Sequence, residues 1–159
     1  VDENMLNKNM PELLKKYGFN RISIGIQDFR KDVLDAINRR ESKKPLEDIV
    51  KKIEDTGFSG TNIDLVYGLP LQTVDSFKKT IDRAINLGTD RIVTFSYAHV
   101  PSVLPRQKIL EEIGFPSPES KAKMYENSYD QLTKAGYVSV GMDHYSKPHD
   151  EFALSLIHI

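Results

Sequence analysis

The strongest constraint on the fold is a recurring unit in which an amphipathic run ends at a glycine and a β-rich run follows. The four glycines are Gly18, Gly57, Gly88 and Gly136. A glycine after an amphipathic run is typical of a helix end, because glycine readily adopts the left-handed backbone conformation that closes many helices. The runs that follow are rich in β-branched and aromatic residues and predict strands at residues 21–27, 61–67, 91–97 and 137–143.

The segments between these runs carry their own helix signals. Pro45 opens an amphipathic run, Thr73 can cap the next helix, and Ser117 before Pro118 and Glu119 is a strong start signal for the last one. We expect residues 100–115, which carry Pro101 and Pro105, to form a loop that contains a little helix. Strands separated by helices indicate parallel pairing with right-handed crossovers, so the sequence predicts an α/β fold. Four strands are too few to close a barrel but suit part of one.

Charge and residue content exclude several classes of function. The net charge is −1 and no five like charges occur together, which argues against nucleic acid or an anionic membrane as the main partner. No apolar run approaches the ~20 residues of a membrane span. The chain has no cysteine, which excludes a thiolate metal site, and its four histidines lack the spacing of a helical zinc site. We therefore predict no cysteine nucleophile, no thiolate metal site and no helical zinc site within these residues.

Both ends of the sequence have unusual features. The first residues offer neither a helix cap nor a lead-in strand, and residues 154–159 read like the translation of a sequencing adapter. We expect residues 1–153 to form part of one domain and residues 154–159 to be non-native. The alternative for residues 154–159 is a short apolar strand.

Polar residues gather at the predicted strand ends, where parallel α/β folds bind their ligands. They are Gln27 and Asp28, Asp64, the run from Tyr97 to His99, and the run from Asp143 to Tyr145. Together they predict a shared edge for a polar ligand.

Each of these residues also has a structural interpretation. Asp28 can cap the next helix, and Arg39 can offset a helix dipole. Asp64 lies in an apolar strand and needs a partner, which is either a ligand or a salt bridge. His99 and His144 can be hydrogen-bonded structural histidines.

Several ordered segments resemble the oxygen-independent coproporphyrinogen III oxidases. They are GFNRISIGIQDF (18–29), AINR (36–39), GFSGTNIDLVYGLPLQT (57–73), FSYAHVP (95–101), PSPESK (116–121) and AGYVSVGMDHYSKPHDE (135–151). The resemblance implies the second half of a radical S-adenosylmethionine (SAM) (β/α)6 barrel, with about four parallel strands and outer helices. The cysteines that hold the [4Fe-4S] cluster belong to the first half, so the cluster ligands are expected outside this chain.

The resemblance also implies a site and a reaction. Gln27, Arg39, Asp64 and Ala98 match family positions that contact SAM. The implied reaction is oxidative decarboxylation of two propionates of coproporphyrinogen III by way of SAM cleavage and a 5′-deoxyadenosyl radical. Because the cofactor carries this chemistry, the resemblance implies no catalytic acid or base and no metal ligand among these residues. It further implies an electron donor and an acceptor that the sequence does not identify, a cytoplasmic location, and a monomer when the protein is full length.

Two alternatives come from other classes. A radical SAM haem chaperone, which binds and transfers haem, shares the barrel but lacks the strings seen here at 97–99 and 141–144, so these strings favour the oxidase. An aldolase-type barrel needs a Schiff-base lysine or metal ligands at strand ends, and no lysine lies on the four predicted strands.

Overall fold

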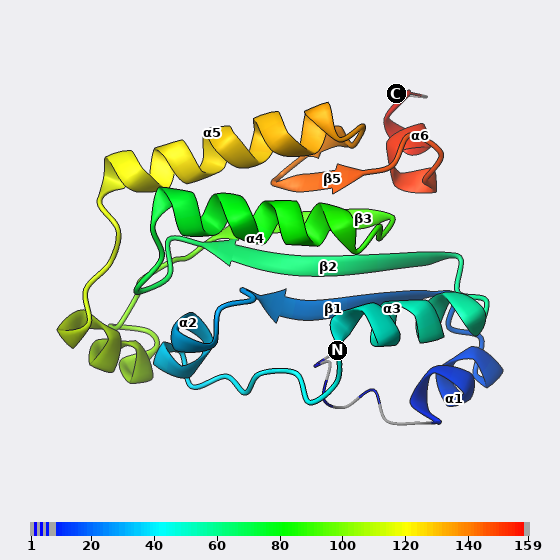
Figure 1. Cartoon of the computed structure of the whole chain (residues 1–159), viewed down its shortest axis with the longest axis horizontal. Coiled ribbons are helices and arrows are strands. Elements are labelled where there is room, and N and C mark those ends of the chain that lie inside the picture. The colour runs from blue at the N-terminus through cyan, green and yellow to red at the C-terminus, as the bar shows by residue number, and fades with distance from the viewer. Residues whose placement is uncertain (1, 3, 5, 7–8, 158–159) are drawn as a thin grey trace.

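The computed structural model describes residues 2, 4, 6 and 9–157, in which helices cover one face of a five-stranded sheet (Figure 1). In chain order the elements are α1 Met10–Lys16, β1 Arg21–Gln27, α2 Lys31–Ala36, α3 Leu46–Asp55, β2 Gly60–Tyr67, α4 Val74–Asn86, β3 Arg91–Ser96, the 3-10 helix η2 Pro105–Glu112, α5 Pro118–Lys134, β4 Val138–Gly141, β5 His144–Ser146 and α6 Glu151–Ile157. The α/β class predicted from the sequence is confirmed.

The sheet is parallel on one side and antiparallel on the other. Its strand order is β1-β2-β3-β5-β4, with β1, β2 and β3 parallel and β5 antiparallel to both of its neighbours. In Figure 1 the arrow of β5 points opposite to the arrows of β1 and β2. The three predicted parallel strands at 21–27, 61–67 and 91–97 are confirmed.

The fourth predicted parallel strand, at 137–143, is wrong. Residues 138–146 form a hairpin, in which β4 ends at Gly141 and β5 returns to pair with β3. Gly141, Met142 and Asp143 all have positive φ angles, of 89°, 50° and 62°. Three successive residues in this conformation reverse the chain, so the β-rich run is two short strands and a turn.

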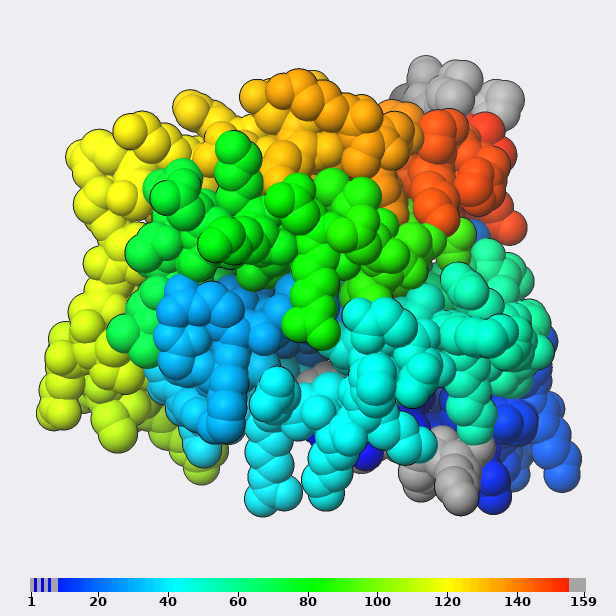
Figure 2. Space-filling view, viewed as in Figure 1, coloured from blue at the N-terminus to red at the C-terminus, as the bar shows by residue number. Residues whose placement is uncertain are grey.

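Alternation along the strands separates the sheet into two faces. Ile22, Ile24 and Ile26 of β1 and Ile63 and Leu65 of β2 are buried against the helices. The helices complete this core with apolar side chains from α3, α4 and α5, including Ile53, Phe77, Ile81, Met124 and Leu132. In the space-filling view from this side, these helices cover most of the sheet (Figure 2). The opposite face, here called the open face, carries the polar side chains of β1 and β2.

The predicted helix starts are confirmed. The Thr73 side chain accepts a hydrogen bond from the Ser76 amide, and the Ser117 side chain accepts one from the Ser120 amide. Pro45 precedes α3 as its N-cap residue. Within the described residues, no helix has the length and apolar character needed to cross a membrane.

The C-terminal residues 151–157 form α6. The alternative of an apolar strand is therefore wrong for residues 154–157, while residues 158 and 159 lie outside the described part of the chain. The domain boundary at residue 153 stays a prediction.

Candidate functional site

The candidate site lies on the open face, toward the carboxyl ends of β1 and β2. Because side chains alternate along a strand, Ser23, Gly25 and Gln27 of β1 share this face with Asn62 and Asp64 of β2. Gly25 pairs directly with Asp64 in the parallel register. Asp64 therefore points away from the helical layer, as the predicted ligand role requires.

Two neighbouring side chains fix the Asp64 carboxylate. Ser23 Oγ donates to Asp64 Oδ2 at 2.8 Å, and Asn62 Nδ2 donates to Asp64 Oδ1 at 2.6 Å. Asn62 Nδ2 also donates to Ser23 Oγ at 2.9 Å, which links all three residues. Among the described residues, no basic side chain forms an ion pair with Asp64, so the salt-bridge alternative for this residue is not what the structure shows. Each carboxylate oxygen keeps acceptor capacity for a further donor.

Gln27 occupies a distorted end of β1. The pairing register shifts between Gly25 and Gln27, and Gln27 has a φ of 70°, which side-chain-bearing residues seldom adopt. Such a local distortion re-aims a side chain, and backbone strain of this kind is concentrated at functional sites. Here it directs the Gln27 amide back over Gly25.

Gly25 provides the space in which two predicted site residues meet. A Cβ atom added at Gly25 would lie 3.0 Å from Gln27 Nε2 and 3.7 Å from Arg39 Nη2. Arg39 Nη2 donates to the Gly25 carbonyl, and Arg39 also lies 3.7 Å from Asp2. Gln27, Arg39 and Asp64 therefore surround the same glycine.

A tight turn after α2 carries Arg39 to this position. Asn38 has a φ of 55°, and the Arg39 amide donates to the Leu34 carbonyl at 2.8 Å. Asparagine tolerates the left-handed conformation well, so the chain turns back toward β1 directly after the helix. Arg39 thus reaches the open face from the end of α2, as predicted.

Ala98, the fourth predicted site residue, lies in the exposed segment beyond β3. Its carbonyl accepts a hydrogen bond from Gln107 Nε2 at 3.0 Å, and Gln107 Oε1 accepts one from the Val100 amide at 2.6 Å. Gln107 therefore holds this segment against η2. Gln107 and Gln27 line the same cavity, of about 1060 Å³, which connects the ends of β1 and β3.

Asp28, the residue after β1, is a structural group. It is 1% exposed, and its Oδ1 accepts from the Arg30 amide at 2.8 Å and from Thr80 Oγ1 at 3.1 Å. Its Oδ2 accepts from Gln72 Nε2 at 2.6 Å, and Gln72 also donates to the Val66 carbonyl. This buried network joins the end of β1 to the loop after β2 and to α4, and so it fixes the carboxyl edge of the sheet.

The two histidines near the predicted strand ends also have protein partners. His99 Nε2 lies 3.0 Å from Glu111 Oε1, and its ring lies 4.7 Å from the Phe115 ring. His144 Nδ1 lies 2.6 Å from the Met142 carbonyl. His144 starts β5 and lines a separate cavity of about 330 Å³ with Arg21, at the amino end of β1. The prediction that the fourth strand brings His144 to the shared carboxyl edge is therefore wrong.

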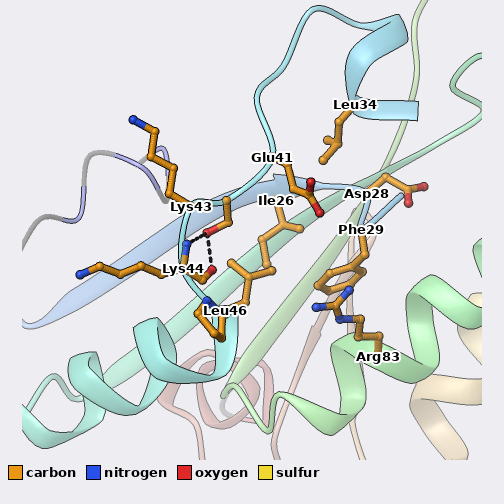
Figure 3. A pocket seen from close by; sticks show the side chains of 11 residues that line it. Ile26, Asp28, Phe29, Leu34, Glu41, Lys43, Lys44, Leu46 and Arg83 are labelled. Carbon is orange, nitrogen blue, oxygen red and sulfur yellow. Dashed lines mark hydrogen bonds between the residues drawn. The ribbon is translucent and has the colours of Figure 1, made fainter. Parts of the chain in front are cut away.

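A third cavity, of about 250 Å³, lies on the helical side (Figure 3). The Arg83 guanidinium lies 4.6 Å from the centre of the Phe29 ring at its wall. Figure 3 shows the side chains of Lys43 and Lys44 extending away from it. None of the four predicted site residues lines this cavity.

The sequence interpretation missed Ser23, Gly25 and Asn62. The alternation of side chains along a strand identifies them, because Ser23 and Gly25 lie an even number of positions from Gln27, and Asn62 lies two positions from Asp64. The described residues contain no group of three or more histidine, aspartate and glutamate side chains placed to hold a metal ion. The chain contains no cysteine.

Comparisons with known proteins agree on one family. The family model described as the radical SAM superfamily matches residues 2–84. Oxygen-independent coproporphyrinogen III oxidase of Escherichia coli strain K12 is 37% identical over 155 residues, which cover 98% of this chain and 34% of the relative. The enzyme of the same name from Pseudomonas aeruginosa is 42% identical over 141 residues, 89% of this chain and 31% of the relative.

A solved structure gives the same result. Coproporphyrinogen III oxidase (HemN) from Escherichia coli, described as a radical SAM enzyme, superposes with a TM-score of 0.94 at 37% identity. The match covers 99% of this chain and 36% of that protein. The chain thus spans about a third of the length of the relatives it matches.

Proposed function

The chain belongs to the radical SAM superfamily, and we propose that the protein containing it is an oxygen-independent coproporphyrinogen III oxidase. The observation that carries the proposal is the similarity of nearly the whole chain, in sequence and in structure, to enzymes of that name. The proposed reaction is oxidative decarboxylation of coproporphyrinogen III propionates to give protoporphyrinogen IX in haem biosynthesis.

The cofactor part of the proposal rests on the residues around Gly25. SAM carries a ribose, an ammonium group and a carboxylate, and the open face offers matching partners for each kind of group. Asp64 accepts hydrogen bonds from hydroxyl or ammonium donors, Arg39 binds a carboxylate, and the Gln27 amide both donates and accepts. The missing side chain at Gly25 leaves room for the Gln27 amide and the Arg39 guanidinium to lie together over β1. These residues fit SAM.

We assign Gln27, Arg39 and Asp64 to side-chain contacts with SAM, and Ala98 to a backbone contact. The Ala98 carbonyl is already bonded to Gln107, so its amide and small side chain are the parts available to the ligand. Ser23 and Asn62 act as positioning residues, because they hold the Asp64 carboxylate in one orientation.

The rest of the protein has to supply what this chain lacks. SAM bound together with a [4Fe-4S] cluster supplies the radical chemistry, and the cluster ligands lie outside this chain. The residues described here bind and orient SAM, and none of them needs to transfer a proton. The proposal includes an electron donor, an electron acceptor, a cytoplasmic location and a monomeric full-length protein.

The test is an anaerobic assay of the full-length protein with coproporphyrinogen III, SAM and a reductant. The proposal expects protoporphyrinogen IX and 5′-deoxyadenosine as products. A haem chaperone would instead bind haem and transfer it to an acceptor protein without converting coproporphyrinogen III, and that result would overturn the proposal. The Asp64→Asn variant is expected to lose SAM affinity, while the exposed Asp75→Asn variant serves as a charge-matched control.

A further inference from the structure

The largest of the cavities described above has an apolar wall that the SAM contacts do not use. Its volume is about 1060 Å³, at the upper end of the range of about 300–1,000 Å³ common for small-molecule sites. Val66 of β2 and Leu69 of the loop after β2 line one side of it, and Ile109 of η2 and Ile113, the C-cap residue of η2, line the other. Ile109 is 67% exposed and Ile113 is 43% exposed, so η2 presents apolar side chains without a cover. Exposed apolar groups gathered at a cavity indicate a bound apolar partner.

The lining of this cavity also includes a positively charged side chain. Arg106 lines the cavity and makes no ion pair within the described residues. Asp35 is the one acidic residue in the wall, and it is paired with Lys31 at 2.5 Å. The cavity therefore combines an apolar surface with an arginine whose charge is not offset by a neighbouring carboxylate.

These properties suit an anionic ligand with a large apolar body, and the substrate of the proposed reaction is of that kind. A tetrapyrrole has a wide apolar ring system with carboxylates on flexible side chains at its periphery. An apolar wall buries the ring system, and an arginine binds a propionate through charge-assisted hydrogen bonds.

We propose that the cavity between η2 and the ends of β1 and β2 binds the tetrapyrrole substrate, with Arg106 contacting a propionate carboxylate and Ile109 contacting the ring system. This inference rests on the proposed function and adds a location and residues to it. Gln27 belongs both to the cavity wall and to the group around Gly25, so the substrate lies directly beside the SAM contacts. Arg106 is a specificity-determining residue in this account, because it selects for the carboxylates.

The competing occupant is another part of the same polypeptide, since the chain spans only about a third of its relatives. A covering segment would also bury Ile109. If such a segment filled the cavity, replacing Arg106 would not change the affinity of the protein for a free tetrapyrrole. The two occupants can therefore be distinguished by measuring that affinity.

The experiment uses the full-length protein with coproporphyrin III, the oxidised and fluorescent form of the substrate, as the probe in the absence of SAM. Fluorescence titration gives its Kd for the wild type and for Arg106→Met, Arg106→Lys and Ile109→Ser. Two matched controls come from the same segment and do not line the cavity, namely Lys108→Met and Val103→Ser. The SAM affinity of each variant and the KM and kcat for coproporphyrinogen III are measured in parallel.

Arg106→Met is expected to raise the Kd for coproporphyrin III, and the KM for coproporphyrinogen III, by about ten- to a hundredfold, with a much smaller change in kcat. Arg106→Lys recovers part of the affinity because it keeps the charge. Ile109→Ser raises the Kd by about three- to tenfold. Both controls, and the SAM affinity of all variants, stay at the wild-type values.

An unchanged Kd in both Arg106→Met and Ile109→Ser overturns this inference while leaving the proposed function in place, provided that the wild type converts the substrate. A loss of SAM affinity equal to the loss of coproporphyrin III affinity also overturns it, because the change is then not specific to the substrate. A wild-type protein that neither binds coproporphyrin III nor decarboxylates the substrate overturns both the inference and the proposed function.

Discussion

Replacing Gly25 with alanine should weaken SAM binding without destabilising the fold. Gly25 does not have a positive φ, so the backbone accepts an alanine there. In such a position, glycine to alanine stabilises a protein by about 0.4–1 kcal/mol, because alanine restricts the unfolded chain more than glycine does. The fold should therefore tolerate the change.

The site should not tolerate it equally well. The new Cβ would lie 3.0 Å from Gln27 Nε2, whereas non-bonded heavy atoms prefer about 3.5–4.0 Å. The Gln27 amide must therefore move by about half an ångström. A hydrogen bond contributes about 0.5–1.5 kcal/mol, so its loss weakens SAM binding by about two- to tenfold. Gly25→Val places methyl groups toward Arg39 Nη2 as well, and we expect a larger loss.

The assay is calorimetric titration of the full-length protein with SAM, together with a urea unfolding curve for each variant. Gly60→Ala is the control, because Gly60 is also a strand residue without a positive φ, and its new Cβ would meet Asp150 at an ordinary 3.7 Å. Gly60→Ala should leave SAM affinity unchanged. If Gly25→Ala and Gly25→Val fold and bind SAM like the wild type, the assignment of this group to SAM is refuted.

Three further outcomes follow from the structure. Asp28→Ala leaves the buried Thr80 and Gln72 donors short of an acceptor, so the free energy of unfolding should fall by about 3–5 kcal/mol in urea denaturation, and a loss below about 1 kcal/mol would contradict the buried network. Burial raises the pKa of Tyr137 from 10.0 to about 12, so the folded state holds this proton more tightly than the unfolded state; the resulting stabilisation is present below pH 10 and is lost as the pH rises toward 12. Unfolding curves across this range should show a smaller loss for Tyr137→Phe than for the wild type, and equal slopes would contradict the assignment. The isolated chain has no cysteine and one wall of the site, so it should incorporate no iron–sulfur cluster and bind SAM only weakly; micromolar SAM binding by a monodisperse, iron-free sample would contradict this.

Local signals in the sequence were sufficient for the helices and for the parallel part of the sheet. Thr73 and Ser117 cap their helices through residues three positions away, so a reader of the sequence sees both partners together. The hairpin of β4 and β5 was harder, because Met142 and Asp143 do not have the common Asn-Gly or Asp-Gly turn sequence. A continuous β-rich run was therefore interpreted as one strand.

The site was predictable where a residue's own strand determines its direction. Asp64 had to lie opposite Ile63 and Leu65, and it does. The partners of a side chain depend on tertiary contacts instead. Asp28 meets Gln72 and Thr80, which are 44 and 52 residues away, and no short-range pattern distinguishes this buried network from a ligand contact.

The central claim is that the open face around Gly25 holds SAM. A crystal structure of the full-length protein with SAM bound tests it most directly. The account predicts that bound SAM contacts Asp64, Arg39 and Gln27, with Ser23 and Asn62 still hydrogen-bonded to the Asp64 carboxylate. SAM bound with none of these three side chains within hydrogen-bond distance would contradict the account.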